Sequence, residues 1–153
     1  MNSINWIKKK PVAHRGLHDG NKHVWENTLA AFSAAINRGF PIECDLHLTK
    51  DGVPVVFHDS PLKRLTGEEG HARDLTAKEI CSLHVGGTKE RVPTLDEMLT
   101  HVAGKVPLVI ELKGDPGHDE GLVKAVGKSL SKYRGKAAIM SFDHHLIREF
   151  AKH

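Results

Sequence analysis

The segment at residues 41–59, PIECDLHLTKDGVPVVFHD, limits what this chain can fold into more than any other. It predicts two strands joined by a tight turn, because Asp51-Gly52 is a strong hairpin signal between alternating segments. Every second side chain of the first strand is ionisable: Glu43, Asp45 and His47. The residues between them are all apolar: Ile42, Cys44, Leu46 and Leu48. Since successive strand residues point to opposite faces, one face packs in a core and the other is either solvated or part of a site.

The turn also predicts a register. If Asp51 and Gly52 are the two loop residues, Lys50 pairs with Val53 and Asp45 falls opposite His58. Cross-strand partners have Cβ atoms about 5 Å apart. We therefore expect Asp45 to lie beside His58 and to favour its imidazolium form.

The remaining pattern alternates strands and helices, which predicts an α/β fold in a single domain. Strands are expected at 12–14, 41–48, 53–58, 106–112 and 136–140. A helix is expected from Asn27 or Thr28 to Gly39, with further helices at 76–83, 94–102, 120–133 and after a cap at Asp143. Residues 60–75 are polar and Gly-rich, which indicates a loop.

Composition excludes several classes of protein. The net charge is 22 minus 19, or +3, and the basic residues are scattered apart from Lys8–Lys10, so we expect no nucleic-acid partner. Cys44 and Cys81 show no CxxC spacing, and Cys44 is expected to be a small buried hydrophobe. The N-terminal segment has no apolar signal region and no apolar run could span a bilayer. We expect a cytoplasmic protein without stable membrane insertion.

A second strand, LVIELKG, repeats the charged pattern with Glu111 and Lys113 on one face. Three carboxylates at strand ends, Glu43, Asp45 and Glu111, suit a hard divalent cation such as Mg²⁺ or Ca²⁺. Structural ion pairing is the alternative.

The tripeptide His14-Arg15-Gly16 ends the first strand. Arginine makes a bidentate fit to phosphate, and Lys113 adds a point charge. Two histidines, His14 and His58, could act as general acid and base on opposite sides of a phosphorus atom. Metal, cations and histidines together indicate phosphodiester cleavage.

Five motifs, AHRG, WENTLAAF, IECDLHLTKDGVPVVFHD, VPTLDEML and LVIELKG, resemble those of the glycerophosphodiester phosphodiesterase family in order and spacing, from about residue 11 to 142. The resemblance implies a TIM-type (β/α)₈ barrel, phosphatidylinositol-phosphodiesterase-like, with its site at the carboxyl ends of the strands. It implies metal ligands for one Mg²⁺ or Ca²⁺ at Glu43, Asp45 and Glu111, catalytic histidines at His14 and His58, phosphate-binding cations at Arg15 and Lys113, and supporting residues at Glu26 and Asn27. A plain helix cap is the other reading of Asn27, and His47 is assigned a supporting role at the rim.

The implied reaction is hydrolysis of a small-molecule glycerophosphodiester to sn-glycerol 3-phosphate and an alcohol. We expect His14 to be the acid and His58 the base, because Asp45 would raise the basicity of His58. Two alternatives remain. One is an inactive truncated barrel that binds metal and phosphate, or only oligomerises. The other is a related phospholipase D-type activity on lysophospholipids, which the polar segment at 60–92 does not favour.

Barrels of this type run to about 250 residues, whereas residues 1–153 supply five of eight strands. We therefore expect one incomplete, C-terminally truncated domain, completed by a missing C-terminal segment or by a homo-oligomer. About 60–92 is expected to be a family-type insertion that shapes substrate access. The hairpin conflicts with purely parallel strands, so a local distortion is expected there.

Overall fold

A computed structural model describes residues 4–152 of the chain; residues 1–3 of the N-terminal segment and residue 153 lie outside the described part. The strands are β1 (Ala13–His14), β2 (Ile42–Leu48), β3 (Pro54–Val56), β4 (Leu108–Leu112) and β5 (Ala137–Met140). The α-helices are α1 (Leu29–Arg38), α2 (Lys63–Thr66), α3 (Ala77–Ile80), α4 (Leu95–Val102), α5 (Leu122–Leu130) and α6 (His144–Phe150). Two 3₁₀ helices are η1 (Ile4–Lys8) and η2 (Ala72–Asp74).

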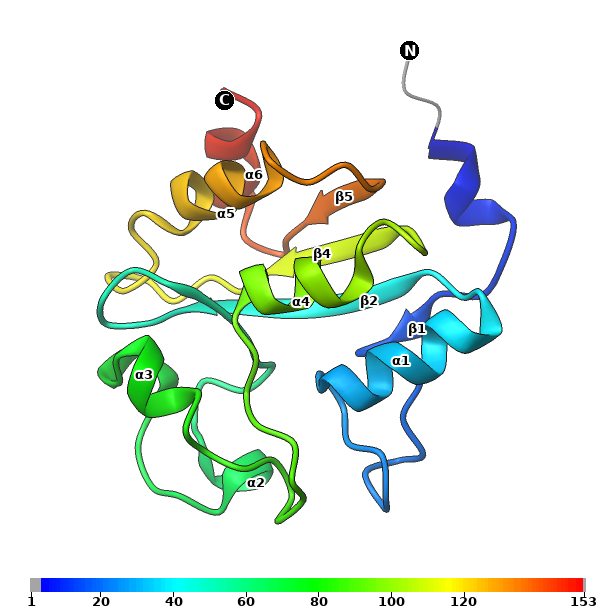
Figure 1. The fold of residues 1–153 in the computed structure, drawn as a ribbon. Coiled ribbons are helices and arrows are strands. Elements are labelled where there is room, and N and C mark those ends of the chain that lie inside the picture. Colours follow the sequence, from blue (N-terminus) through cyan, green and yellow to red (C-terminus); the bar gives the residue numbers. More distant parts are fainter. Residues whose placement is uncertain (1–3, 153) are drawn as a thin grey trace.

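The five strands form one sheet, which confirms the expected α/β class (Figure 1). Four of them are parallel neighbours in the order β1-β2-β4-β5. The fifth, β3, runs antiparallel to β2 and lies off this path. The distortion expected at the hairpin is therefore a strand folded back on its neighbour, and it leaves the parallel order undisturbed.

The predicted hairpin register is wrong by one residue. Leu48 pairs with Pro54, and the Thr49 N–H donates to the Val53 carbonyl at 3.0 Å, so the loop has three residues rather than two. Gly52 closes a turn onto the Thr49 carbonyl and adopts φ 79°, the left-handed conformation of a three-residue hairpin loop. The Thr49 hydroxyl fixes this loop, because it donates to Asp51 and accepts the Val53 N–H. Asp45 therefore faces Phe57 across the hairpin, through a hydrogen bond from the Phe57 N–H to the Asp45 carbonyl at 3.0 Å.

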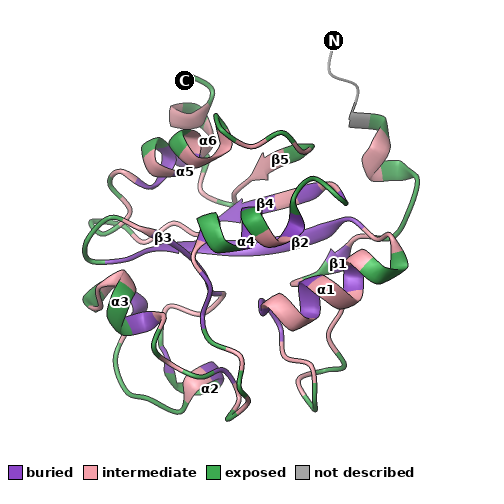
Figure 2. Ribbon diagram, viewed as in Figure 1, coloured by how far each residue is buried: buried purple, intermediate pink, exposed green. Residues whose placement is uncertain are grey.

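The apolar face of β2 packs under the helices, as its alternation predicts. α1, α4 and α5 follow one another along one side of the sheet (Figure 1) and contribute Phe32, Met98 and Val126 to the main core. All seven residues of β2 are buried (Figure 2), so its charged side chains are held away from bulk water as well. Cys44 is a buried free thiol within this core.

Most helix boundaries follow their sequence signals. Thr28 caps α1 by accepting the Ala31 N–H, and Gly39 ends it at φ 66°. The capping box at Thr76 is present, although α3 ends at Ile80 rather than near residue 83. Two expectations are wrong: Asp143 precedes α6 without any side-chain cap, and residues 60–75 contain α2 and η2 rather than loop alone.

The segment at 60–92 builds a second hydrophobic cluster on the other side of the hairpin. Val55 and Phe57 pack there against buried residues of the segment: Leu62, Leu65, Ala72, Ile80, Val85 and Val92. These short elements are therefore anchored to β3. Within residues 4–152, no helix has both the length and the apolar character needed to cross a bilayer.

Candidate active site

Three carboxylates meet on the polar face of the sheet. Glu43 and Asp45 lie two residues apart on β2, and the register of β2 with β4 places Glu111 directly beside Asp45. One oxygen from each of the three lies within 4.8 Å of the others. All three residues are buried, with exposed fractions of 7%, 0% and 6% respectively. The sequence pattern thus predicted which carboxylates would come together.

The carboxylates carry more negative charge than the protein compensates. Burial, reinforced by the charge of Asp45, raises the pKa of Glu43 to about 7. Glu43 Oε1 and Asp45 Oδ1 are among the few buried side-chain atoms of the described residues that have no hydrogen-bond partner. Clustered carboxylate oxygens that lack hydrogen bonds match the ligands that Mg²⁺ and Ca²⁺ take, so these residues fit a divalent cation.

Two cations border this cluster. Lys113 Nζ lies 2.8 Å from Glu111 Oε1 and 3.4 Å from Asp45 Oδ1. Arg15 follows β1 with φ 58°, and this left-handed turn directs its backbone N–H to Glu43 Oε2 at 3.0 Å. The Arg15 Nε atom lies 3.6 Å from Asp45 Oδ2 and has no hydrogen-bond partner among the described residues. A positive edge therefore adjoins the three carboxylates.

His14 enters the site from β1, whose register pairs it with Glu43. Its Nε2 atom lies 3.8 Å from Glu43 Oε2, and two-thirds of its side chain (67%) is exposed to solvent. Partial burial and the charge of Arg15 lower the pKa of His14. The ring can therefore lose a proton more readily than a free histidine.

Glu26 and Asn27 support the site from the loop before α1. Asn27 Nδ2 donates to Asp45 Oδ2 at 3.0 Å, and its backbone N–H donates to the Arg15 carbonyl at 2.8 Å. Because Thr28 is the helix cap, the plain-cap reading of Asn27 is wrong. Glu26 Oε1 accepts a hydrogen bond from Arg15 Nη1 at 3.0 Å.

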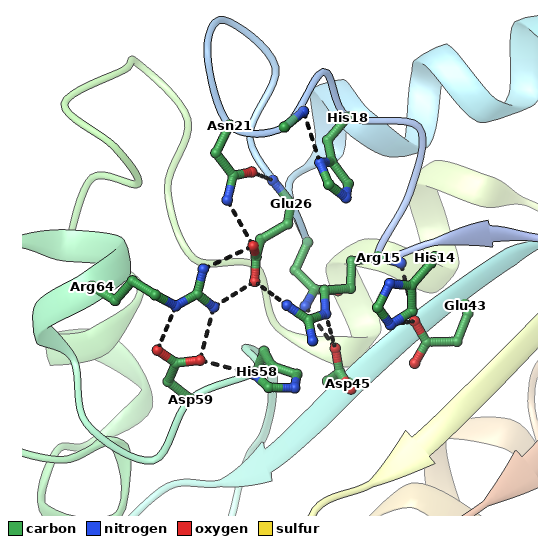
Figure 3. A network of polar contacts seen from close by, with 12 residues as sticks. His14, Arg15, His18, Asn21, Glu26, Glu43, Asp45, His58, Asp59 and Arg64 are labelled. Carbon is green, nitrogen blue, oxygen red and sulfur yellow. Dashed lines mark hydrogen bonds and ion pairs between the residues drawn. The ribbon is translucent and has the colours of Figure 1, made fainter.

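His58 follows β3 and is held by a different carboxylate from the one expected. Its Nδ1 atom lies 2.8 Å from Asp59 Oδ1, and His47 Nε2 bonds its carbonyl at 2.8 Å. The pairing with Asp45 across the hairpin fails because of the three-residue turn, although Figure 3 shows the His58 ring on the side of Asp45 and Arg15. Burial lowers the pKa of His47, which favours a neutral ring there.

Three further residues belong to this network and were missed from the sequence: Asn21, Asp59 and Arg64. Asn21 donates to Glu26 Oε2 at 2.7 Å, and Arg64 contacts both Asp59 and Glu26 (Figure 3). Asp59 could have been found, because it directly follows His58. Arg64 lies 38 residues from Glu26, and no local pattern joins them.

Comparison with known proteins supplies the family. The model of the glycerophosphoryl diester phosphodiesterase family matches residues 14–152. A glycerophosphodiester phosphodiesterase of Caldanaerobacter subterraneus is 40% identical over 95% of this chain, which covers 63% of that relative.

Solved structures agree with this match. A glycerophosphodiester phosphodiesterase from Agrobacterium tumefaciens is 32% identical, with a TM-score of 0.77 over 92% of this chain and 61% of its own. A phosphodiesterase from Oleispira antarctica, solved in complex with the product sn-glycerol-3-phosphate, is 30% identical, with a TM-score of 0.81 over 92% of this chain and 60% of its own.

The chain thus spans about three-fifths of the length of the relatives it matches. Its parallel strands and covering helices correspond to part of a TIM-type barrel. By motif order, fold and family match, the chain belongs to the glycerophosphoryl diester phosphodiesterase family.

Proposed function

We propose that this protein hydrolyses glycerophosphodiesters to sn-glycerol 3-phosphate and an alcohol. The observation that carries the proposal is the meeting of three buried carboxylates with Arg15, Lys113 and His14 on one face of the sheet. The product bound by the Oleispira antarctica relative is sn-glycerol-3-phosphate, which supports the same substrate class here.

Glu43, Asp45 and Glu111 would hold one divalent cation, Mg²⁺ or Ca²⁺. Once bound, the cation supplies positive charge against the phosphate oxygens of the diester. Glu43 Oε1 and Asp45 Oδ1 support this assignment, since neither oxygen has a hydrogen-bond partner among the described residues.

Arg15 and Lys113 would bind the phosphate. Arg15 Nε, which has no hydrogen-bond partner among the described residues, and Lys113 Nζ both lie beside Asp45, so an anion placed there would contact donors that directly follow β1 and β4. These donors are fixed before the substrate arrives, which lowers the cost of stabilising charge during displacement at phosphorus.

His58 would act as the base and His14 as the acid. Asp59 accepts from His58 Nδ1, which leaves Nε2 of that ring free to take a proton from an attacking water. Protonated His14 would donate to the oxygen of the leaving alcohol, and its lowered pKa makes it the stronger acid once it is protonated. Water and the diester then give sn-glycerol 3-phosphate and the free alcohol.

The segment at about 60–92 would be the insertion that shapes access to this face within the domain at 1–153. Its cluster against Val55 and Phe57 places it over the hairpin that carries His58. His47 would hold the His58 backbone rather than contact substrate.

The test is to incubate the chain with glycerophosphocholine in Mg²⁺, in Ca²⁺ and in EDTA, and to measure sn-glycerol 3-phosphate and choline. Formation of both, with loss in EDTA and in His58→Ala, is expected. His101→Ala is a matched control, because that histidine bonds Ser33 on the helical side of the sheet. A folded chain that binds the cation yet releases neither product, or releases phosphocholine and glycerol, would refute the proposal.

A further inference from the structure

Arg64, from the short helix α2, hydrogen-bonds two carboxylates of the polar network, those of Asp59 and Glu26. Its Nε and Nη2 atoms donate to Asp59 at 2.7 and 2.8 Å. Its Nη1 and Nη2 atoms donate to Glu26 at 3.0 and 2.8 Å. Four hydrogen bonds to two carboxylates use both edges of one guanidinium, a geometry that a lysine ammonium cannot reproduce.

The first of these carboxylates, that of Asp59, orients the His58 ring. Asp59 Oδ1 lies 2.8 Å from His58 Nδ1. The hydrogen bonds from Arg64 lower the pKa of Asp59 to about 2, so Asp59 is ionised at neutral pH and can only accept. The proton of a neutral His58 ring is therefore on Nδ1, and Nε2 carries the lone pair.

The second carboxylate, that of Glu26, orients the Arg15 guanidinium. Glu26 is almost wholly buried, with 3% of its side chain exposed, and it accepts from Arg15 Nη1 at 3.0 Å. Burial alone would raise the pKa of Glu26, but hydrogen bonds from Arg64 and Asn21 overcome this and lower it to about 2. Glu26 thus holds two guanidinium groups side by side (Figure 3).

Building on the proposed function, we propose that Arg64 is a positioning residue that couples the orientation of His58 to that of Arg15. The guanidinium of Arg64 fixes two carboxylates at once: Asp59, which orients His58, and Glu26, which orients Arg15. The neighbouring residues Leu62 and Leu65 are buried in the second hydrophobic cluster, so α2 itself has a fixed place. The segment at 60–92 therefore contributes a side chain that orients groups of the reaction.

The test uses nitrogen-detected NMR of the His58 ring, assigned with His58→Gln, in the cation-free protein. In the wild type we expect the Nδ1–H form. Arg64→Met and Arg64→Lys are both expected to lose it, because neither side chain can hold Asp59 by two bonds. Lys63→Met is the matched control: it removes a neighbouring cation whose exposed side chain forms an ion pair with Glu69. Circular dichroism checks the fold of each variant, and Arg64→Lys keeps the charge if Arg64→Met does not fold.

Coupling is tested with Glu26→Gln. This change should alter the His58 ring signals through Arg64, and it should add nothing in the Arg64→Met background. Unchanged His58 signals in Arg64→Lys, or in Glu26→Gln, would overturn the inference.

Hydrolysis of glycerophosphocholine separates this inference from the proposed function. We expect kcat/KM to fall about 10- to 100-fold in Arg64→Lys, the cost of a slightly misplaced reacting group, and to be unchanged in Lys63→Met. If the wild type shows no turnover but the His58 signals still depend on Arg64, the coupling stands and the proposed activity fails. If the wild type turns over and Arg64→Lys is as active, the coupling fails.

Discussion

Replacing Glu43 with glutamine is expected to stabilise the cation-free protein above pH 7 and to change little near pH 4.5. The pKa of Glu43 is raised from 4.5 to about 7 by burial and by the charge of Asp45. For a carboxyl group with a raised folded-state pKa, stability is fully present below the unfolded pKa and is lost as the pH rises through the folded pKa. Glutamine keeps the neutral shape of the side chain at every pH.

The expected change in the free energy of unfolding follows from the pKa shift of Glu43. The shift of about 2.5 pKa units at about 1.4 kcal/mol per unit corresponds to roughly 3 to 4 kcal/mol over the full titration. About 3 kcal/mol of this is lost by the wild type between pH 4.5 and pH 8, because the unfolded carboxyl group is already half ionised at pH 4.5. Since 7% of Glu43 is exposed, solvent screens little of this. The pKa values of His14 and His47 are lowered, so both residues gain stability over the same range. Because His14 Nε2 lies 3.8 Å from Glu43 Oε2, the difference between wild type and Glu43→Gln reports Glu43 together with its effect on His14 and on the neighbouring carboxylates.

The assay is urea unfolding in EDTA, followed by circular dichroism at pH 4.5 and pH 8. We expect the two proteins to have similar free energies of unfolding at pH 4.5, and the variant to be about 3 kcal/mol more stable at pH 8. Millimolar Mg²⁺ or Ca²⁺ should reverse the order, because a cation that binds only the folded wild type stabilises it by mass action. A wild type at least as stable as Glu43→Gln at pH 8 in EDTA would refute the idea of an uncompensated carboxylate cluster.

Three further predictions concern single residues. Gly16→Ala should lower the free energy of unfolding by ~2 kcal/mol in urea, because its φ is 82° and an added Cβ would lie 2.7 Å from that of Ala31; unchanged stability would contradict this close approach. Thr28→Ala should cost about 1 kcal/mol by removing the cap of α1, measured in the same way; a variant as stable as the wild type would show that the cap adds nothing. His58→Ala should abolish turnover but retain cation binding by calorimetry, because its ring bonds Asp59 rather than the three carboxylates; lost binding would place His58 among the metal ligands.

The fold was largely predictable because its signals are local. The alternation of β2 and the cap and stop of α1 at Thr28 and Gly39 depend on neighbouring residues. The hairpin register was missed because the Thr49 hydroxyl, which bonds the Val53 N–H, turns an apparent two-residue loop into one of three residues. Through this one side chain, every cross-strand pair of the hairpin differs by one residue from the predicted register.

The same distinction decides which residues of the site could be predicted from the sequence. Glu43, Asp45 and Glu111 could be placed together because parallel strands bring equivalent positions side by side. Arg64 could not, because its contact with Glu26 depends on how an irregular segment folds back over the hairpin. The period of apolar residues and the spacing of motifs predict regular strands. The position of the segment at 60–92 depends instead on the packing of its hydrophobic cluster.

β2 has partners along both of its edges, with β1 and β3 pairing different parts of one side and β4 pairing the other. Its backbone amides should therefore be among the slowest in the chain to exchange with solvent deuterium, since they open only in the largest unfolding events. The loops that carry Arg15 and His58 have fewer such backbone bonds, so their amides should exchange before those of β2. The carboxylates of Glu43 and Asp45 are therefore carried by the part of the chain that should open last.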